Sequence, residues 1–133
     1  MTATALETWH RLVRTGDAAG LRDLVAEDAV FFSPVVHAAQ HGRKLTVMYL
    51  SAAFKVFFNP TFRYVREIVG AHDAMLEFET EIDGVLVNGV DIIRWNDANR
   101  IVDFKVMLRP LKGVNIIHQK MGEMLAAAQA ARR

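Results

Sequence analysis

With 133 residues and a formal net charge of +1, the chain is long enough for one domain with a hydrophobic core, and it lacks the basic excess typical of nucleic-acid and membrane-surface binders. The absence of cysteine excludes disulfides, thiolate metal sites and a cysteine nucleophile. No apolar run is long enough to cross a bilayer and the N-terminus has no secretory signal, so we expect a cytoplasmic protein with neither a nucleic-acid nor a membrane partner.

The first part of the chain is expected to be mostly helical, because apolar residues recur there every three or four positions. Gly16 ends the first helix, and Asp17 is placed to cap the second. Asn59-Pro60 ends the third. The expected elements are a helix over 4–15, a second helix after Asp17, a short strand over 29–33, a loop over 34–42 and a third helix over 43–58.

From Thr61 onward apolar and polar residues alternate, which is the pattern of half-buried strands. Turn-forming residues separate these segments, most clearly at Asp83-Gly84. Helices followed by a meander of strands indicate an α+β domain over residues 1–133, in which a curved, mostly antiparallel sheet covers the helices and encloses a pocket. The expected elements are strands over 61–69, 74–82, 85–95 and 101–108, followed by a helix over 112–131.

The hairpin formed by 85–95 and 101–108 places one carboxylate, Asp91, on an otherwise apolar face, opposite Phe104 in the expected register. A carboxylate on an apolar face without water costs free energy unless it is ion-paired, protonated or used in binding or catalysis. Burial would raise its pKa, and as a neutral acid it could donate a hydrogen bond to a ligand carbonyl, with Gly89 on the same face leaving room for that ligand. The alternative is a structural acid satisfied by a hydroxyl, an indole or a water.

Two further groups of residues are candidates for the site. His37 and His41 lie in the loop expected to border the pocket, where a histidine can act as a general base near neutral pH; the alternative is two solvated loop histidines. No metal ligand set and no phosphate or dinucleotide motif is identified, so no metal or cofactor is expected. The residues expected to line the pocket are Trp9, Phe31, Ser33, Phe54, Phe104, Val106 and Leu108. Alternatively, Trp9 is only a core residue, and Ser33 is only a turn residue before Pro34.

Several short motifs of the chain occur together in one known superfamily. They are Gly16-Asp17 followed by Leu21 and Leu24, residues 27–31 before Pro34, Gly42 at the start of the third helix, and the segment 90–101, in which a strand carries Asp91 and ends at Arg94-Trp95 and the next strand begins at Arg100-Ile101. With these motifs the chain resembles the nuclear-transport-factor-two-like superfamily, whose cone-shaped, cystatin-like α+β fold includes ketosteroid isomerases, polyketide cyclases and scytalone dehydratase. The resemblance implies a C-terminal helix near the mouth of the cone, a hydrophobic small molecule inside it and a homodimer through the outer sheet face.

Ketosteroid isomerases use an acidic base just before a proline, together with a tyrosine and a neutral aspartic acid that form an oxyanion hole. In this sequence the tyrosine position falls at Trp9, the base position at Ser33 and the neutral acid at Asp91. Because only Asp91 matches, steroid isomerisation is not expected.

The resemblance instead implies an isomerase, cyclase or dehydratase acting on an apolar carbonyl compound, with Asp91 as the acid and His37 or His41 as the base. A non-catalytic binding module for a hydrophobic metabolite and a dimeric protein-interaction module are the alternatives, so whether the protein is an enzyme stays open.

Overall fold

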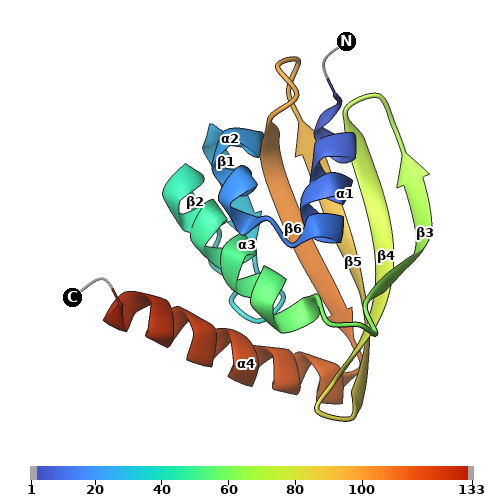
Figure 1. Cartoon of the computed structure of the whole chain (residues 1–133), viewed down its shortest axis with the longest axis vertical. Helices are drawn as coiled ribbons and strands as arrows, with labels where there is room; N and C mark the ends of the chain where they lie inside the picture. Colours follow the sequence, from blue (N-terminus) through green and yellow to red (C-terminus); the bar gives the residue numbers. More distant parts are fainter. Residues whose placement is uncertain (1–2, 132–133) are drawn as a thin grey trace.

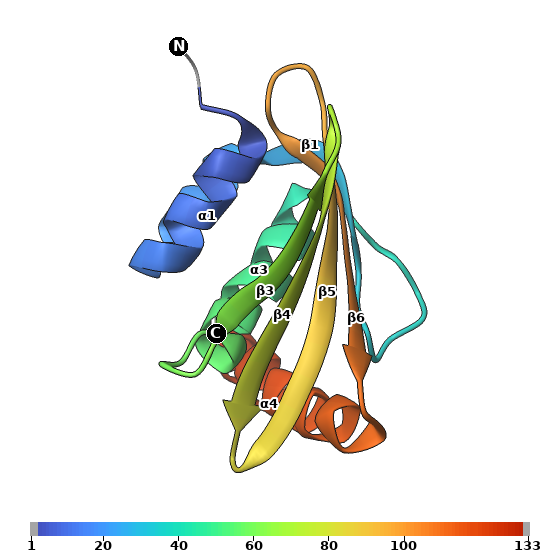
Figure 2. The same cartoon turned by 90° about the vertical axis from the view of Figure 1, so that its right-hand side faces the viewer.

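A computed structural model describes residues 3–131 of the chain as helices packed on one side of a curved sheet (Figures 1 and 2). β1 begins four residues earlier than expected, the second helix is a short segment before it, and β2 was not expected. The elements are α1 (Ala5–Thr15), the 3₁₀ segment η1 (Ala18–Gly20), α2 (Leu21–Leu24), β1 (Val25–Phe32), β2 (Gln40–His41), α3 (Arg43–Phe57), β3 (Arg63–Val69), β4 (Asp73–Ile82), β5 (Val85–Trp95), β6 (Ile101–Arg109) and α4 (Leu111–Ala130).

The six strands form one open sheet in the order β2-β1-β6-β5-β4-β3. β1 and β6 run parallel, whereas the other neighbouring strands run antiparallel. α1 and α3 lie against the inner face, and α4 crosses the end of the sheet where β4 and β5 turn (Figure 1). The predicted α+β fold, with a curved and mostly antiparallel sheet around N-terminal helices and a C-terminal helix, is confirmed. No helix of the described part is both long and apolar enough to cross a membrane.

Local signals explain where α1 begins and ends. The side chain of Thr4 accepts a hydrogen bond from the backbone N–H of Glu7 (3.1 Å), which satisfies one of the free donors at the helix start. Gly16 ends the helix in the left-handed conformation (φ 70°), which costs glycine little. The helix buries Trp9 and Leu12, three residues apart on one face, so its apolar spacing determines which side chains enter the core.

The hairpin of β5 and β6 has a different register from the expected one. Asp91 pairs with Val106 rather than with Phe104 for two reasons: Trp95 pairs with Ile101 instead of Arg100, and a β-bulge then leaves Val102 without a partner of its own. The expected register was therefore wrong by two positions. A shift of two keeps every side chain on its own face, so Asp91, Phe104 and Val106 still share the inner face.

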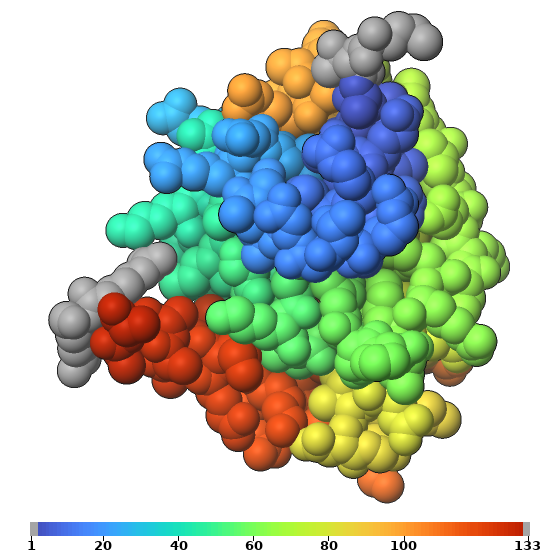
Figure 3. Space-filling view, in the orientation of Figure 1, coloured from blue at the N-terminus to red at the C-terminus, as the bar shows by residue number. Residues whose placement is uncertain are grey.

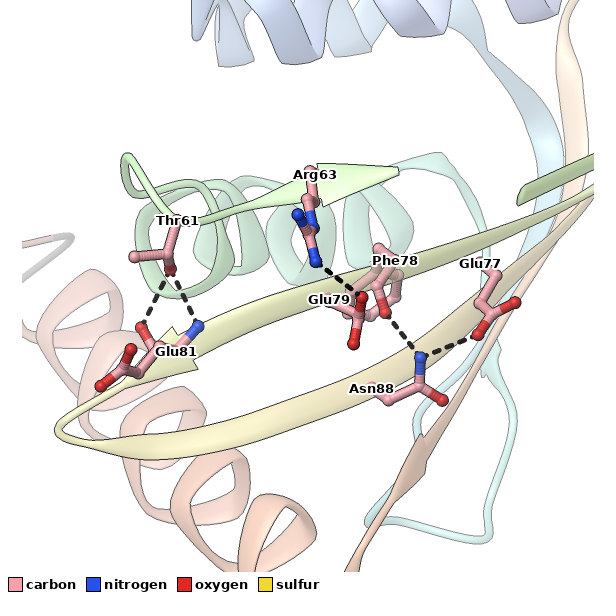
Figure 4. Close-up of polar contacts among 7 residues, drawn as sticks. All are labelled: Thr61, Arg63, Glu77, Phe78, Glu79, Glu81 and Asn88. Carbon is pink, nitrogen blue, oxygen red and sulfur yellow. Dashed lines mark hydrogen bonds and ion pairs between the residues drawn. The ribbon is translucent and has the colours of Figure 1, made fainter. Parts of the chain in front are cut away.

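The outer face of the sheet is polar and ion-paired around β4, as alternation predicts. Arg63 on β3 lies 3.2 Å from Glu79, and the Asn88 side chain donates to the Glu77 carboxylate (2.9 Å) and to the Phe78 carbonyl (3.2 Å) (Figure 4). These surface pairs each contribute at most about 1 kcal/mol. Apolar side chains are also exposed on β3 to β6, among them Val65, Ile68, Val69, Met75, Leu86 and Met107.

Two side-chain contacts hold the helices to the end of the sheet. The buried hydroxyl of Thr80 on β4 donates to the Phe57 carbonyl at the end of α3 (3.1 Å). Lys120 on α4 forms an ion pair with Asp83 in the β4–β5 turn (2.8 Å). Both helices are thereby fixed to the end of the sheet where β4 turns into β5.

Candidate functional site

A chain of three side chains leads into the interior of the cone and ends at Asp91. Asp91 projects from β5 into the core and is 6% exposed. Its Oδ2 accepts a hydrogen bond from the Tyr64 hydroxyl (2.8 Å), and the Tyr64 oxygen accepts one from the indole Nε1–H of Trp9 (3.0 Å). Residues from α1, β3 and β5 therefore converge on one carboxyl group.

The hydrogen-bonding capacities of these groups fix the direction of the chain. The indole N–H of Trp9 can only donate, so the Tyr64 oxygen must accept. Tyr64 has one proton to donate, and it is directed at Oδ2 of Asp91. When Asp91 is neutral, its proton therefore lies on Oδ1, which has no hydrogen-bond partner within residues 3–131. Neutral Asp91 is left with one free donor.

The environment of Asp91 brings the pKa of its carboxyl group close to neutral pH. Burial raises the pKa of Asp91 to about 7, and the hydrogen bond from Tyr64, which stabilises the carboxylate, opposes the shift. Burial and then the charge of Asp91 raise the pKa of Tyr64 well above its ordinary value. At neutral pH Tyr64 therefore stays protonated, while Asp91 exists as both acid and carboxylate, the condition under which a group exchanges protons most readily.

Asp91 forms part of the wall of a small hollow of about 20 Å³, the inner hollow. An adjoining hollow of about 130 Å³ lies between α3, α4 and the loop after β1. The inner hollow and this outer hollow share Ala53, Phe57 and Val106 as wall residues, so they are neighbours, and together they are called the ligand path below. Aromatic and aliphatic side chains make up most of this path, which suits an apolar ligand.

The structure brings together several of the residues expected to bind a ligand. Trp9, Phe104 and Val106 line the inner hollow with Asp91. Phe31 and Ser33 line the outer hollow, and the Ser33 hydroxyl accepts hydrogen bonds from the backbone N–H groups of the two residues after Pro34, as a turn residue does.

Two other expected residues lie outside both hollows. Phe54 packs edge-on against Trp9, with ring centroids 5.6 Å apart, and so supports the wall from behind. Leu108 is partly buried beside Gly89. The room expected beside Gly89 is already filled, since a Cβ there would lie 2.5 Å from the Phe78 ring and 2.7 Å from Leu108. The expectation that Gly89 makes space for a ligand was wrong.

The structure does not bring the two candidate bases to Asp91. His37 and His41 are both exposed, and neither lines the inner or the outer hollow. His118 on α4, for which no role was expected, lines the outer hollow instead. Within residues 3–131 no cluster of three His, Cys, Asp or Glu side chains is arranged to hold a metal ion.

Tyr64 is the residue that the sequence interpretation missed. The tyrosine position of the ketosteroid isomerases falls at Trp9, on a different element from Tyr64. A signal was present: Tyr64 and Phe62 are two positions apart in an alternating segment, so they project to the same, inner face. In the structure their rings pack edge-on at 5.1 Å.

The sequence profile of the SnoaL-like domain matches residues 6–104. The chain belongs to the SnoaL-like family. This confirms the resemblance to the nuclear-transport-factor-two-like superfamily. No curated protein sequence matches this SnoaL-like chain.

Solved structures agree with this assignment. A steroid delta-isomerase from Pseudomonas aeruginosa is 37% identical over 95% of this SnoaL-like chain and 92% of its own, with a TM-score of 0.89. A protein with a cystatin-like fold from Silicibacter pomeroyi is 30% identical, with coverage of 90% and 83% and a TM-score of 0.81. An NTF2-like protein of unknown function from Mesorhizobium loti is 25% identical, with coverage of 80% and 88% and a TM-score of 0.68.

Proposed function

We propose that this SnoaL-like protein binds an apolar carbonyl compound in the cone and catalyses proton transfer on it, as an isomerase, cyclase or dehydratase does. The observation that supports this most is the buried Asp91, whose carboxyl group lines an apolar hollow and has one oxygen free of protein hydrogen bonds. A neutral acid in an apolar wall donates a strong hydrogen bond to a carbonyl oxygen on which negative charge develops.

In the proposed reaction a base removes a proton from the carbon next to the substrate carbonyl, and the electron pair moves onto the carbonyl oxygen. Asp91 stabilises that oxygen through the proton on Oδ1, while the hydrogen bonds from Tyr64 and Trp9 polarise the acid from behind. In an isomerisation the proton returns to a different carbon. In a dehydration the electron pair expels hydroxide, which takes up a proton and leaves as water.

His118 is the proposed base. It lines the outer hollow, and an imidazole accepts a proton near neutral pH. His37 and His41, the bases expected from the sequence, are less suited, because neither lines the path to Asp91.

The size of the path limits the substrate. Its two hollows measure about 20 Å³ and 130 Å³. An apolar protein cavity of roughly 150 Å³ holds one benzene ring. We therefore propose a ligand with a single ring or a short branched chain, and not the four fused rings of a steroid, although the Pseudomonas aeruginosa relative is a steroid delta-isomerase.

A non-catalytic binding module for a small hydrophobic metabolite is the second candidate function. It is favoured by the exposure of His118, whose imidazole makes no hydrogen bond within residues 3–131 and so is not held in a fixed orientation. A pocket with an acid but no fixed base would bind a carbonyl compound without transforming it.

Turnover of one-ring enones tests the proposal. Conversion of 3-cyclohexenone into its conjugated isomer is followed by ultraviolet absorbance, and affinity by calorimetry. We expect Asp91→Asn to weaken binding and abolish turnover, and His118→Gln to abolish turnover alone. Binding without turnover across β,γ-enones and β-hydroxy ketones would favour the binding module.

A variant that fills the path serves as a control for where the ligand binds. Ala53 borders both hollows, so Ala53→Leu should block the path and abolish binding. Ala127→Leu, on the exposed face of α4, makes the same change of side chain and should bind normally. If Ala53→Leu binds one-ring ketones as well as the wild type does, the ligand is not in the cone and the proposal fails.

A further inference from the structure

A third hollow lies on the face of α3 that points away from the ligand path. It is an open groove of about 710 Å³ between α3 and α4, in the part of the surface where α3 is visible between the N-terminal helices and α4 (Figure 3). One stripe of α3 at helical spacing forms a wall, and two residues of α4 face it. The stripe is Lys44, Val47, Met48, Ser51, Ala52 and Lys55, and the α4 residues are Met124 and Ala128.

The groove concentrates positive charge in a chain that is otherwise nearly neutral. Four cations line it, Arg22, Arg43, Lys44 and Lys55, against the single acid Glu27. None of the four forms an ion pair within residues 3–131. Arg43 donates from Nε to the Val25 carbonyl (3.0 Å), which orients its guanidinium at the end of the groove. An occupant that carries negative charge is therefore favoured.

The spacing of these cations indicates an extended occupant. Lys44 and Lys55 stand three helical turns apart on α3, roughly 16 Å at the rise of an α-helix. Arg22 and Arg43 lie with Lys44 at one end of the groove, in α2 and at the start of α3. A single carboxylate or phosphate group cannot contact both ends, whereas a chain with several negative charges can.

The middle of the groove is apolar, which a phosphate backbone would not use. Val47 and Met48 are partly buried on α3, and Met124 is partly buried on α4. Methionine side chains are flexible and adapt to the shape of an incoming apolar surface. Apolar contacts in the centre and cations at both ends match the apolar stripe and the acidic flanks of an amphipathic helix.

We propose that the groove between α3 and α4 docks an acidic amphipathic helix of about three turns from a partner protein. Its apolar stripe packs on Val47, Met48 and Met124, and its carboxylates pair with the cations at the two ends. This inference does not depend on the proposed function, because the groove and the ligand path lie on opposite faces of α3.

The methionines of this chain allow the docking site to be located by NMR. Met48 and Met124 line the groove, Met121 lines the ligand path, and Met75 and Met107 are exposed on the outer sheet face. The probe is a synthetic amphipathic peptide with leucine at helical spacing and flanking glutamates, added to protein labelled with ¹³C in its methionine methyl groups. We expect the signals of Met48 and Met124 to shift and those of Met75, Met107 and Met121 to stay in place.

Charge-reversal variants test the role of the cations. Lys44→Glu with Lys55→Glu should weaken peptide binding by about tenfold or more at low salt, measured by fluorescence anisotropy. The matched control is Arg14→Glu with Arg100→Glu, two exposed cations outside the groove, which should bind as the wild type does. Because all four side chains are exposed, the variants should keep the wild-type circular dichroism spectrum.

Three results would overturn the proposal. The first is no shift of the Met48 and Met124 signals at millimolar peptide. The second is equal binding of a peptide of the same composition in scrambled order, or equal weakening by the control variant, since either shows charge attraction without a docked helix. The third is a stronger response of the same two signals to single-stranded DNA, which would assign the groove to nucleic acid. None of these results bears on ligand binding in the cone, which Met121 reports.

Discussion

Tyr64 reaches Asp91 across an intervening strand. The two residues lie on β3 and β5 with β4 between them, yet the hydroxyl and the carboxyl group are 2.8 Å apart. Phe78 on β4 pairs with both Tyr64 and Gly89, and its ring tip occupies the place where Gly89 has no side chain. The ring therefore leans toward β5, and Tyr64 passes beside it to the acid.

A methyl group at position 89 should disturb this arrangement. In Gly89→Ala the new Cβ would lie 2.5 Å from the Phe78 ring, 2.7 Å from Leu108 and 2.9 Å from the Met107 carbonyl, so something must move. We expect a loss of about 1–3 kcal/mol in the free energy of unfolding, measured with urea. Gly122→Ala, in a helix with open space around it, should instead stabilise by about 0.5–1 kcal/mol. Equal effects of the two variants would contradict the packing described for Gly89.

The raised pKa of Asp91, about 7 against an ordinary value of 3.8, makes stability depend on pH. The folded state holds this proton more tightly than the unfolded state, so the stabilising effect of the neutral acid is complete at low pH and is lost as the pH rises through about 7. Between the two pKa values the free energy of unfolding should fall by about 1.4 kcal/mol per pH unit.

Asp91→Asn isolates this effect, because the amide has nearly the same shape and does not ionise. Urea unfolding at several pH values from 5 to 9 should give a steeper decline for the wild type than for the variant, with the difference levelling off above pH 8. Identical pH dependence in the two proteins would mean that Asp91 does not titrate in this range.

Loss of the Tyr64 hydroxyl should affect both its neighbours. In Tyr64→Phe the indole N–H of Trp9 is buried without its acceptor, which destabilises the fold by about 1–3 kcal/mol. Asp91 also loses the hydrogen bond that lowers its pKa, so the pH dependence should move to higher pH. Tyr49→Phe is the matched control, since the Tyr49 hydroxyl has no hydrogen bond within residues 3–131 and its ring stacks on Phe31. If the free energy of unfolding depends on pH in Tyr64→Phe as it does in the wild type, the Tyr64 hydroxyl does not lower the pKa of Asp91.

The sequence was sufficient to predict which residues share a face of the sheet, but not which residues pair across neighbouring strands. Alternation placed Asp91, Phe104 and Val106 on one inner face, and this survives any register change of two positions. The bulge at Val102 could not be predicted, because it depends on how the strands twist together rather than on a local residue preference.

Contacts that form only in three dimensions account for what the sequence did not reveal at the site. Tyr64 and Asp91 lie on two strands with β4 between them, and no spacing along one strand encodes their contact. His37 and His41 were placed near the pocket because a loop was expected there, but loop direction is not set by periodicity, and both side chains are exposed. The roles of the candidate residues in ligand binding and catalysis stay predictions.

We also expect a homodimer through the outer sheet face. Ile68 and Met107 on this face are 58% and 50% exposed, and exposed apolar side chains that lie together mark interaction surfaces. Light scattering at micromolar concentration should give twice the chain mass, and Met107→Glu should give a monomer. Leu111→Glu alters a residue that is 74% exposed at the start of α4 and should leave the dimer intact. A monomer mass for the wild type would rule out the interface.

The parallel pairing of β1 with β6 bears on the order in which the molecule forms. Phe31 lies beside Phe104, so one wall of the ligand path joins a strand from the first quarter of the chain to the last strand made. Such a distant pairing is slow, because a long loop must close before any contact repays its entropy. A nascent chain that ends before β6 has the β1–β2 pair and the strands β3 to β5 but nothing that joins them into one sheet, so the capacity to hold a ligand arises only once β6 has been made.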